Sequence, residues 1–470
     1  MLVLWISGIL SLGPVFGGLI NPQDASLFFA WAVLVWGIGS AWTIWNKDFH
    51  IPNARLLGWA SILVFLSFIS AYFSPIPTQS FIAWRSLFLG LWIIPMTALI
   101  PVISRARINQ TIFFSAYLLC AYAILQIFIF GHFEVSSFFP NPNILASFIV
   151  LVLPLAWEEK KIFLTALLTL ILLATKSVGA WMSLAIAALI LERQMSKKIK
   201  MTALFVFFVC GVLIFRKPQF DFQNRWVWWQ AALRVIFKRP WLGVGPGVLT
   251  YLIPTEVSPH LLRSLYAHEF YLETAAGCGI NYLLIFLAGL FFFFPKSPLR
   301  RLAILASLIL GFWDYSLSVP AIFFIFCYLA ASEIPRTADV LSLGDLRFPL
   351  ALLVLVSTFA LSRPAWARWQ EERLKSQGIS LFNRNAPIDQ VHEEFLKALS
   401  WAPDADVERL LAEIDFQQGK LLSSAKRWEK AAQENPCRPS TWKALENAYN
   451  LLGEKEKAQG IARESVNACL

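Results

Sequence analysis

Long apolar runs separated by short polar loops fill the first three quarters of the chain. A helix needs about twenty apolar residues to cross the hydrocarbon core of a bilayer. On that measure the pattern predicts membrane-spanning helices at residues 2–20, 26–46, 56–74, 81–103, 110–130, 142–157, 161–175, 179–192, 201–215, 268–294, 299–314, 319–332 and 348–362. The first run lacks the basic segment that begins a cleavable signal peptide, so we expect it to be retained. The predicted fold is an all-α polytopic membrane protein with about 12–14 spans.

The long loop of residues 216–267 contains one further helix, "NRWVWWQAALRVIFKRPW", which has two distinct faces. At about 100° per residue, its polar face consists of Gln230, Arg234 and Lys238. Its apolar face consists of Trp228, Trp229, Ala232, Val235 and Ile236. Arg225 falls among the apolar positions, where a helix lying on a membrane would not place a cation. Either the first turn frays and releases this side chain to water, or Arg225 points inward to a partner such as a phosphate, which suits a planar guanidinium.

A glycine-rich loop, "PWLGVGPG", follows this helix. Such loops bind phosphates when they connect a strand to a helix in a βαβ unit, and the sequence predicts no such unit. We therefore expect Gly243, Gly245 and Gly247 to form a tight turn that returns the chain to the membrane.

The composition changes after the last predicted span, and residues 363–470 are polar, helix-rich and repetitive. Equivalent residues recur 33 or 34 positions apart: Phe395 and Trp428, Ala398 and Ala431, Pro403 and Pro436, Gly419 and Gly453. This is the period of tetratricopeptide-like helix pairs. We expect a membrane domain at residues 1–362 and a soluble helical domain at 363–470. The soluble domain either offers a groove to a protein or glycan partner or only caps the fold.

Overall composition narrows the class of protein. Hydrophobic residues make up 57% of the chain, charged residues make up 15%, and the mean hydropathy is +0.59, which excludes a soluble enzyme. The formal charge of +10 does not indicate nucleic acid, because lysine and arginine in such a chain first serve to orient loops. The six cysteines do not form a CxxC pair, so no metal site is predicted.

Loop charges predict the orientation in the membrane. If the N-terminus is cytoplasmic, the short outside loops "NPQD", "SPIPTQ" and "GHFEVSSFFP" contain no lysine or arginine, as the positive-inside rule requires. The same count puts loop 216–267 and the C-terminal domain outside the cytoplasm. Cys437 and Cys469 could then form a disulfide there.

Cations on the outer side are exceptions to this rule and need a reason. Arg85 lies about one turn inside the outer end of the fourth predicted span, where it either snorkels to the headgroups or binds an anion. Lys176 lies in the short outer turn "TKSVG", and Arg225, Arg239 and Arg263 lie in the long loop. These five residues are our candidates for binding an anionic group.

One histidine stands at the start of the tenth predicted span, in "RSLYAHEFYLETAAGCGI". Histidine has a pKa near the working pH, so His268 is the candidate general base, with Glu269 or Glu273 orienting its ring. The alternative is an interfacial histidine that seals the end of a span.

Several pieces together resemble the conserved loop of the O-antigen ligase and polymerase superfamily. They are Arg225, Trp229 and Ala232, then "RPWLGVGPG", then His268 with Tyr271 and Leu272. "FFPNPNILASFIVLVLPLA" is similar to the family's NPN segment, and "WDYSLSVP" is similar to its late Asp-Ser-Leu-Pro segment. The resemblance covers roughly residues 135–332 and depends on the order and spacing of the pieces.

The resemblance implies an integral membrane glycosyltransferase of the GT-C type in the cytoplasmic membrane of a bacterium. Such enzymes transfer a glycan from undecaprenyl diphosphate to the hydroxyl of a glycan, lipid or protein acceptor on the outer side, without a metal or other cofactor. A family arginine that is thought to hold the diphosphate would fall on Arg225, and the family histidine would fall on His268. The match of Arg85 to a second arginine is looser.

The chain departs from the family pattern at three places. Val178 in "KSVGAW" stands where the family often has arginine, and Lys176 supplies only a point charge nearby. His268 is followed by Glu269 instead of asparagine. Gly277 stands where an acid is common, unless Glu273 one turn earlier replaces it. These departures bear on catalytic competence more than on the fold.

Other functions remain open at this level. A polymerase or a protein O-glycosyltransferase would share the donor and the motif. A transporter or a non-enzymatic scaffold would belong to another class. Transporters gather polar residues near the bilayer midplane, whereas this chain gathers its charge at the outer rim, which favours surface chemistry.

Overall fold

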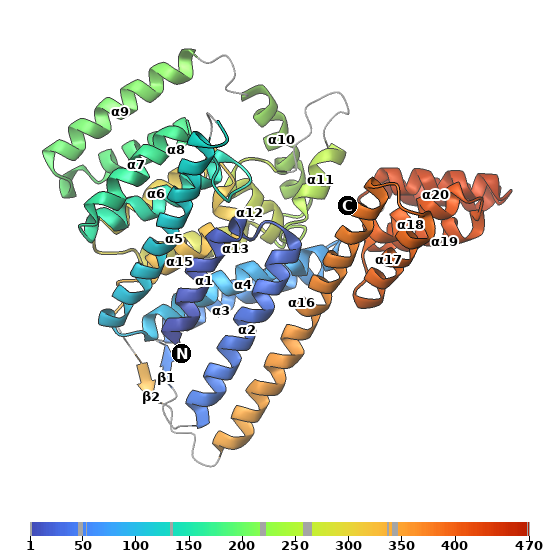
Figure 1. Cartoon of the computed structure of the whole chain (residues 1–470), viewed down its shortest axis with the longest axis horizontal. Helices are drawn as coiled ribbons and strands as arrows, with labels where there is room; N and C mark the ends of the chain where they lie inside the picture. The colour runs from blue at the N-terminus through green and yellow to red at the C-terminus, as the bar shows by residue number, and fades with distance from the viewer. Residues whose placement is uncertain are drawn as a thin grey trace.

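In the part of the chain that the structure describes, the regular elements are helices apart from two short strands (Figure 1). The computed structural model describes residues 2–45, 50–52, 54–131, 135–216, 222–256, 266–335, 338–340, 346–467 and 469. Within them, β1 (His50–Pro52) pairs antiparallel with β2 (Ala338–Val340) and joins two loops at one end of the molecule.

Five helices in the described part of the chain are long and apolar enough to cross a membrane: α2 (Pro22–Trp45), α3 (Ala54–Tyr72), α4 (Pro77–Leu99), α5 (Val102–Phe128) and α16 (Arg347–Asn383). Shorter apolar helices pack with them: α1 (Leu2–Val15), α6 (Pro142–Glu158), α7 (Ile162–Ala174), α8 (Val178–Ile190), α13 (Ile280–Phe292) and α15 (Pro320–Ala331). α9 (Lys197–Arg216) and α14 (Pro298–Leu310) complete the set. Every predicted span thus coincides with helix, but several helices are too short to cross a bilayer unaided.

The predicted span at 268–294 is wrong in one respect, because it consists of two helices. α12 (Phe270–Cys278) ends at Gly279, whose φ of 89° breaks the helix before α13 begins. The glycine-rich loop docks at this break: the Val244 amide donates to the Ala276 carbonyl, and the Gly245 amide donates to the Gly277 carbonyl, each at 2.8 Å. The three loop glycines all have positive φ, as the predicted tight turn requires.

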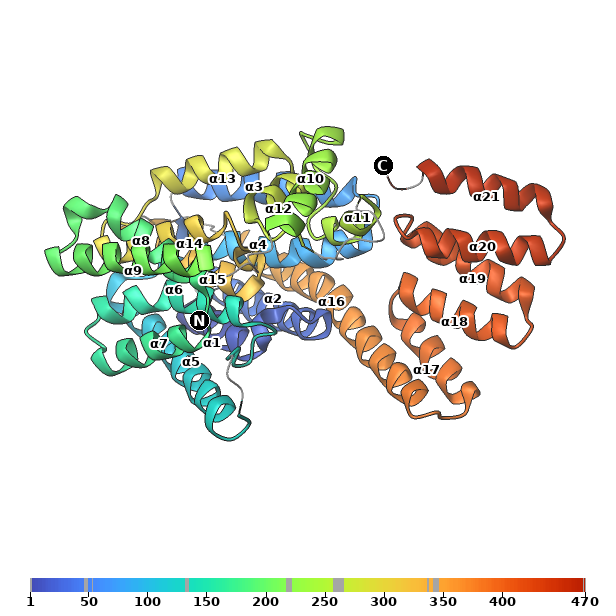
Figure 2. The same ribbon diagram turned by 90° about the horizontal axis from the view of Figure 1, so that it is seen from above.

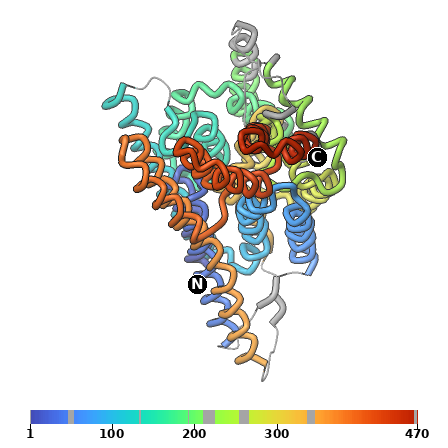
Figure 3. Tube along the Cα trace, turned by 90° about the vertical axis from the view of Figure 1, so that its right-hand side faces the viewer, coloured from blue at the N-terminus to red at the C-terminus, as the bar shows by residue number. Residues whose placement is uncertain are grey.

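The predicted domain boundary falls inside one continuous helix. α16 extends for 37 residues, from the membrane bundle into the C-terminal domain, and packs along α2 (Figures 1 and 3). The two backbones approach closely at Gly37, because a Cβ there would overlap the side chain of Thr358.

Helices α17 (Ile388–Trp401), α18 (Ala405–Gln417), α19 (Leu421–Glu434), α20 (Pro439–Leu451) and α21 (Lys455–Asn467) stack into the C-terminal domain (Figure 2). The repeated positions are used alike: Phe395 and Trp428 are both buried, and Gly419 and Gly453 both have positive φ. A disulfide joins Cys437 to Cys469, the pairing that the sequence suggests for an extracytoplasmic tail.

Two further helices lie in the long loop of residues 216–267, which the sequence predicts to be the outer loop: α10 (Phe222–Lys238) and α11 (Leu249–Glu256). Their buried side chains share one hydrophobic cluster with Cys437 of the C-terminal domain. The loop therefore lies between the membrane bundle and the helical repeats.

Candidate functional site

Arg225 lies at the start of α10, whose two faces are as predicted. Trp228, Ala232, Val235 and Ile236 are buried, whereas Arg234 and Lys238 are exposed. Arg225 is half-buried and donates a hydrogen bond from Nη1 to the backbone carbonyl of Trp313. Of the two orientations considered for this side chain, the structure has the inward one.

The turn that receives Arg225 follows α14. Asp314 is buried and accepts hydrogen bonds from the Ser316 amide, at 2.7 Å, and from the Ser316 hydroxyl, which fixes the short helix η3 (Ser316–Ser318). Burial raises the pKa of Asp314, while the hydrogen bonds from Ser316 and the charge of Arg225 oppose that rise. Asp314 thus holds the turn and places a carboxyl group beside the guanidinium of Arg225.

His268 lies close to Arg225, in the loop before α12 and outside the helices that could span the membrane. Its ring centroid is 5.1 Å from that of Trp228 and 5.2 Å from that of Tyr315. Burial and the positive charge of Arg225 lower the pKa of His268 to about 4. The imidazole is therefore neutral at pH 7, but it is a weak proton acceptor.

Glu269 caps α12. Its carboxylate accepts a hydrogen bond from the Leu272 amide, in the manner of an N-cap residue, and the side chain is buried. The carboxylate accepts hydrogen bonds from the backbone of α12, and the predicted role of orienting the His268 ring stays a prediction. Burial raises the pKa of Glu269 to about 7.

The raised pKa of Glu269 predicts a pH-dependent stability. A carboxyl group whose folded-state pKa exceeds its unfolded-state value stabilises the fold below pH 4.5, and this contribution is lost as the pH rises through 7. Glu269→Asn keeps a good N-cap and removes the buried charge. We expect its Tm to exceed that of the wild type at pH 8.5, by the equivalent of about 3 kcal/mol at most, and to match it near pH 4. Thermal unfolding in detergent at both pH values checks this, and an equal shift at both values would contradict it.

Glu273 lies one turn into α12, below Glu269. The backbone amides of Ala267 and His268 donate hydrogen bonds to its carboxylate. Its Oε1 atom is buried and has no hydrogen-bond partner. Glu273 also lines a cavity, whereas His268 and Arg225 do not.

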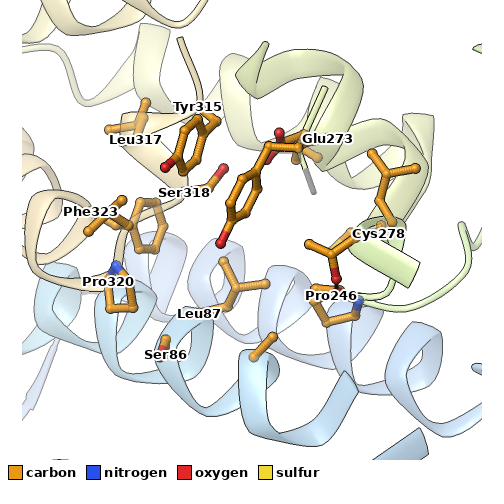
Figure 4. Close-up of a pocket in the computed structure, with 18 of the residues that line it drawn as sticks. Ser86, Leu87, Pro246, Glu273, Cys278, Tyr315, Leu317, Ser318, Pro320 and Phe323 are labelled. Atoms are coloured by element: carbon orange, nitrogen blue, oxygen red, sulfur yellow. Dashed lines mark hydrogen bonds between the residues drawn. The ribbon is translucent and has the colours of Figure 1, made fainter. Parts of the chain in front are cut away.

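The cavity has a volume of about 310 Å³ and opens between segments that are far apart in the sequence (Figure 4). α4 contributes Ser86 and Leu87, and the glycine-rich loop contributes Pro246. The turn after α14 contributes Tyr315 and Ser318. The polar groups that line it are Gln79, Ser86, Thr250, Tyr251, Tyr266, Glu273, Thr274, Tyr282, Tyr315 and Ser318. A mostly apolar cavity with a few converging polar groups is the usual form of a small-molecule site.

The other predicted cations lie elsewhere. Arg85 leaves α4 on a different side from the cavity, with its guanidinium 5.5 Å from the ring centroid of Phe29, and its Nη1 is buried without a hydrogen-bond partner. Arg239 donates to the Phe73 carbonyl at 3.2 Å, on the outside of the loop. Arg263 lies outside the described residues.

Lys176 is exposed in the turn between α7 and α8 and has a φ of 54°. The first turn of α8 packs against Trp313, because a Cβ at Gly179 would lie 3.3 Å from the indole ring. Lys176 is therefore at the same end of the bundle as Arg225, while Val178 begins the adjoining helix. Of the four predicted cations that the structure describes, Arg225 alone contacts the elements around His268.

Sequence reasoning missed the tyrosines. Tyr266 and Tyr315 stack with ring centroids 4.1 Å apart, and the Tyr315 hydroxyl accepts a hydrogen bond from the Asn141 amide at 3.3 Å. Asn141 begins the NPN segment and caps α6 through Ile144. A tyrosine taken singly suggests only an aromatic belt. The resemblance was the signal that could have identified Tyr315, because its NPN and WDYSLSVP pieces meet at this residue.

One group of carboxylates among the described residues is close enough to share a metal ion: Glu371, Glu372 and Asp404. Arg368 and Lys375 form ion pairs with all three at distances down to 2.8 Å. The cluster therefore connects α16 to the loop before α18 through the protein's own cations.

Comparison with known proteins agrees with this geometry. Residues 163–287 match the family model described as O-antigen ligase. The matched segment runs from α7 into α13 and includes Arg225, His268 and Glu273. A search of curated proteins found no match. The chain is thus a multi-pass membrane protein by its long apolar helices, and its residues 163–287 are similar to the O-antigen ligase family.

Proposed function

We propose that the protein transfers a glycan from a polyprenyl diphosphate, specifically undecaprenyl diphosphate, to the hydroxyl group of an acceptor. The observation that carries this proposal is that segments far apart in the sequence meet at one place in the structure. Arg225 from the outer loop, His268 before α12, and the turn at Trp313–Tyr315 are far apart in the sequence and lie together beside one cavity. Each of these pieces belongs to the motif set that the family shares.

Arg225 would act on the leaving group. Displacement of a lipid diphosphate from an anomeric carbon leaves concentrated negative charge on the departing oxygens. A guanidinium carries five N–H donors in a fixed fork, so it can hold the Trp313 carbonyl and a phosphate oxygen together. The aromatic rings that pack around His268 would keep water from this region and so strengthen that interaction.

The reaction would take place on the outer side of a bacterial cytoplasmic membrane. The Cys437–Cys469 disulfide supports this orientation, because disulfides persist in oxidising compartments. The outer loop shares a hydrophobic cluster with Cys437, so loop and C-terminal domain lie on the same side. No metal or other cofactor is part of this proposal, and the stacked C-terminal helices would bind a protein or glycan partner.

An in vitro assay tests the proposal. Membranes that contain the protein are supplied with glycan on undecaprenyl diphosphate, and the loss of lipid-linked glycan is measured with the gain of acceptor-linked glycan. We expect transfer by the wild type, and we expect His268→Ala to fold normally but lose most of the activity, because the His268 ring packs against Trp228, on the helix that carries Arg225, and against Tyr315. Absence of transfer by the wild type with glycan, lipid and protein acceptors would refute the function. Undiminished transfer by His268→Ala would remove this residue from the site.

A further inference from the structure

We propose that Glu273 is the group that takes the proton from the acceptor hydroxyl, and that the cavity beside it binds the hydroxyl-bearing end of the acceptor. This inference rests on the proposed function and deepens it. It assigns to Glu273 the role that sequence reasoning gives to His268.

The charge of the cavity wall indicates what the cavity binds. Among the described residues that line it, Glu273 is the only one with a formal charge. Because its described lining contains no lysine, arginine or histidine, the cavity offers no cation to a diphosphate, which carries negative charge. Hydroxyl groups are suited to it, because they donate to a carboxylate and also exchange hydrogen bonds with Tyr266, Tyr315 and Ser318. The diphosphate is then expected on the side of Arg225, beyond the tyrosines.

Glu273 has the geometry of a general base: its carboxylate is held in place, and one of its oxygen atoms lacks a hydrogen-bond partner. Amides of Ala267 and His268 hold the carboxylate, while Oε1 is buried without a partner beside a 310 Å³ space. A buried polar atom without a partner costs about 1–3 kcal/mol. A substrate hydroxyl that donates to Oε1 would remove this cost.

His268 fits a supporting role better. It does not line the cavity, and its pKa of about 4 makes it a poor acceptor for a proton. Its backbone has a φ of 54°, and from this conformation its amide is one of the two that hold Glu273. His268 therefore lies between the two groups: its ring is close to Arg225, and its backbone amide donates to the carboxylate of Glu273 in the cavity wall.

The surroundings of Glu273 increase its basicity. α12 is a nine-residue helix that is not among the candidate spans, and burial raises the pKa of Glu273 well above its ordinary value. The carboxyl groups of Asp314, from the turn after α14, and of Glu269, from the same helix, raise it further. Because the base must be ionised, the transfer rate is expected to rise with pH through this elevated pKa.

The step balances as a single displacement. The acceptor O–H bond breaks and its proton passes to Glu273. A bond forms between the acceptor oxygen and the anomeric carbon, while the bond from that carbon to the diphosphate oxygen breaks. The electron pair leaves with the polyprenyl diphosphate beside Arg225, and water later removes the proton from Glu273.

Glu273→Gln is the principal test, because the amide keeps the size of the side chain and an acceptor for the two backbone amides. We expect kcat to fall by about 10²-fold or more with little change in KM, and the rise of rate with pH to disappear. Glu333→Gln is the matched control, since Glu333 also accepts hydrogen bonds from two backbone amides, those of Lys296 and Ser297. This contact lies before α14 and after α15, at the ends of the two helices away from the turn that joins them. That variant is expected to retain wild-type rate and pH profile.

Formate distinguishes chemistry from structure. In Glu273→Ala, added formate is expected to occupy the space of the lost carboxylate and to restore part of the activity, with a dependence on formate concentration that Glu333→Ala does not share. If Glu273→Gln transfers glycan at the wild-type rate, the inference is overturned. If it loses activity while the residual pH profile is unchanged and formate has no effect, Glu273 is structural and the inference is also overturned. If the wild type itself transfers nothing, the proposed function fails, which is a separate result.

Discussion

Arg225→Ala is expected to reduce glycan transfer by about 10²–10³-fold, which is the usual effect of removing one group that stabilises charge in a transition state. The variant removes the guanidinium from beside Asp314 and His268, so the departing diphosphate loses its stabilising cation. The expected defect lies in kcat, with a smaller increase in KM for the lipid-linked donor. Initial rates at several donor concentrations measure both constants.

Two companion variants make this prediction specific. Arg225→Lys keeps a charge but loses the planar fork, and we expect it to recover only a small part of the activity. Arg234→Ala removes an arginine from the exposed face of the same helix and is expected to keep the wild-type rate. A similar loss in Arg234→Ala and Arg225→Ala would mean that general surface charge, and not a specific site, supports transfer.

Gly243→Ala is expected to destabilise the membrane domain by at least about 3 kcal/mol, or to prevent accumulation of folded protein. Gly243 has a φ of 68°, where an alanine costs about 1–2 kcal/mol. Its new Cβ would also lie 2.6 Å from the Ala276 carbonyl oxygen and overlap that of Gly277. Relief of this overlap would separate the loop from α12 and break the hydrogen bonds of Val244 and Gly245, each contributing about 1 kcal/mol.

Gly419→Ala is the matched control for this effect. Gly419 has a φ of 74°, but a Cβ there would meet nothing within 4 Å. It therefore carries the backbone strain without the steric overlap. The unfolding temperature can be measured as the temperature at which the protein stops being monodisperse after heating. We expect this temperature to fall by a large amount for Gly243→Ala and by a small amount for Gly419→Ala. Equal shifts would mean that the contact at the helix break contributes little.

The helices could be predicted because apolar runs and faces are local properties of the sequence. The faces of α10 follow from its period, and the equivalence of Phe395 and Trp428 follows from the repeat. The site depended on the resemblance, since no local pattern states that Asn141 and Tyr315 will meet. Their contact is determined by how α6 and the turn after α14 pack.

The pattern of apolar and polar residues did not predict the directions of side chains or the positions of helix breaks. Arg85 lies in the first half of α4, but its side of the helix faces Phe29 and not the cavity. Arg105 falls between the predicted spans 81–103 and 110–130, yet it is buried in α5 and donates hydrogen bonds to the carbonyls of Ile100 and Ser332 at 3.0 and 2.7 Å. The 268–294 run reads as one apolar segment, whereas the structure has a helix break at Gly279, where the glycine-rich loop docks.

Because α16 is one continuous helix, it limits which insertions and deletions the chain tolerates between the membrane bundle and the C-terminal domain. A flexible linker would let the C-terminal helices vary in length and angle independently of the bundle. Here one added residue near position 362 would turn everything after it by about 100° and shift it by about 1.5 Å. Insertions or deletions at this junction are therefore tolerated only when they restore the helical phase, after about seven residues, so the orientation of the repeats is inherited from α2 and the bundle.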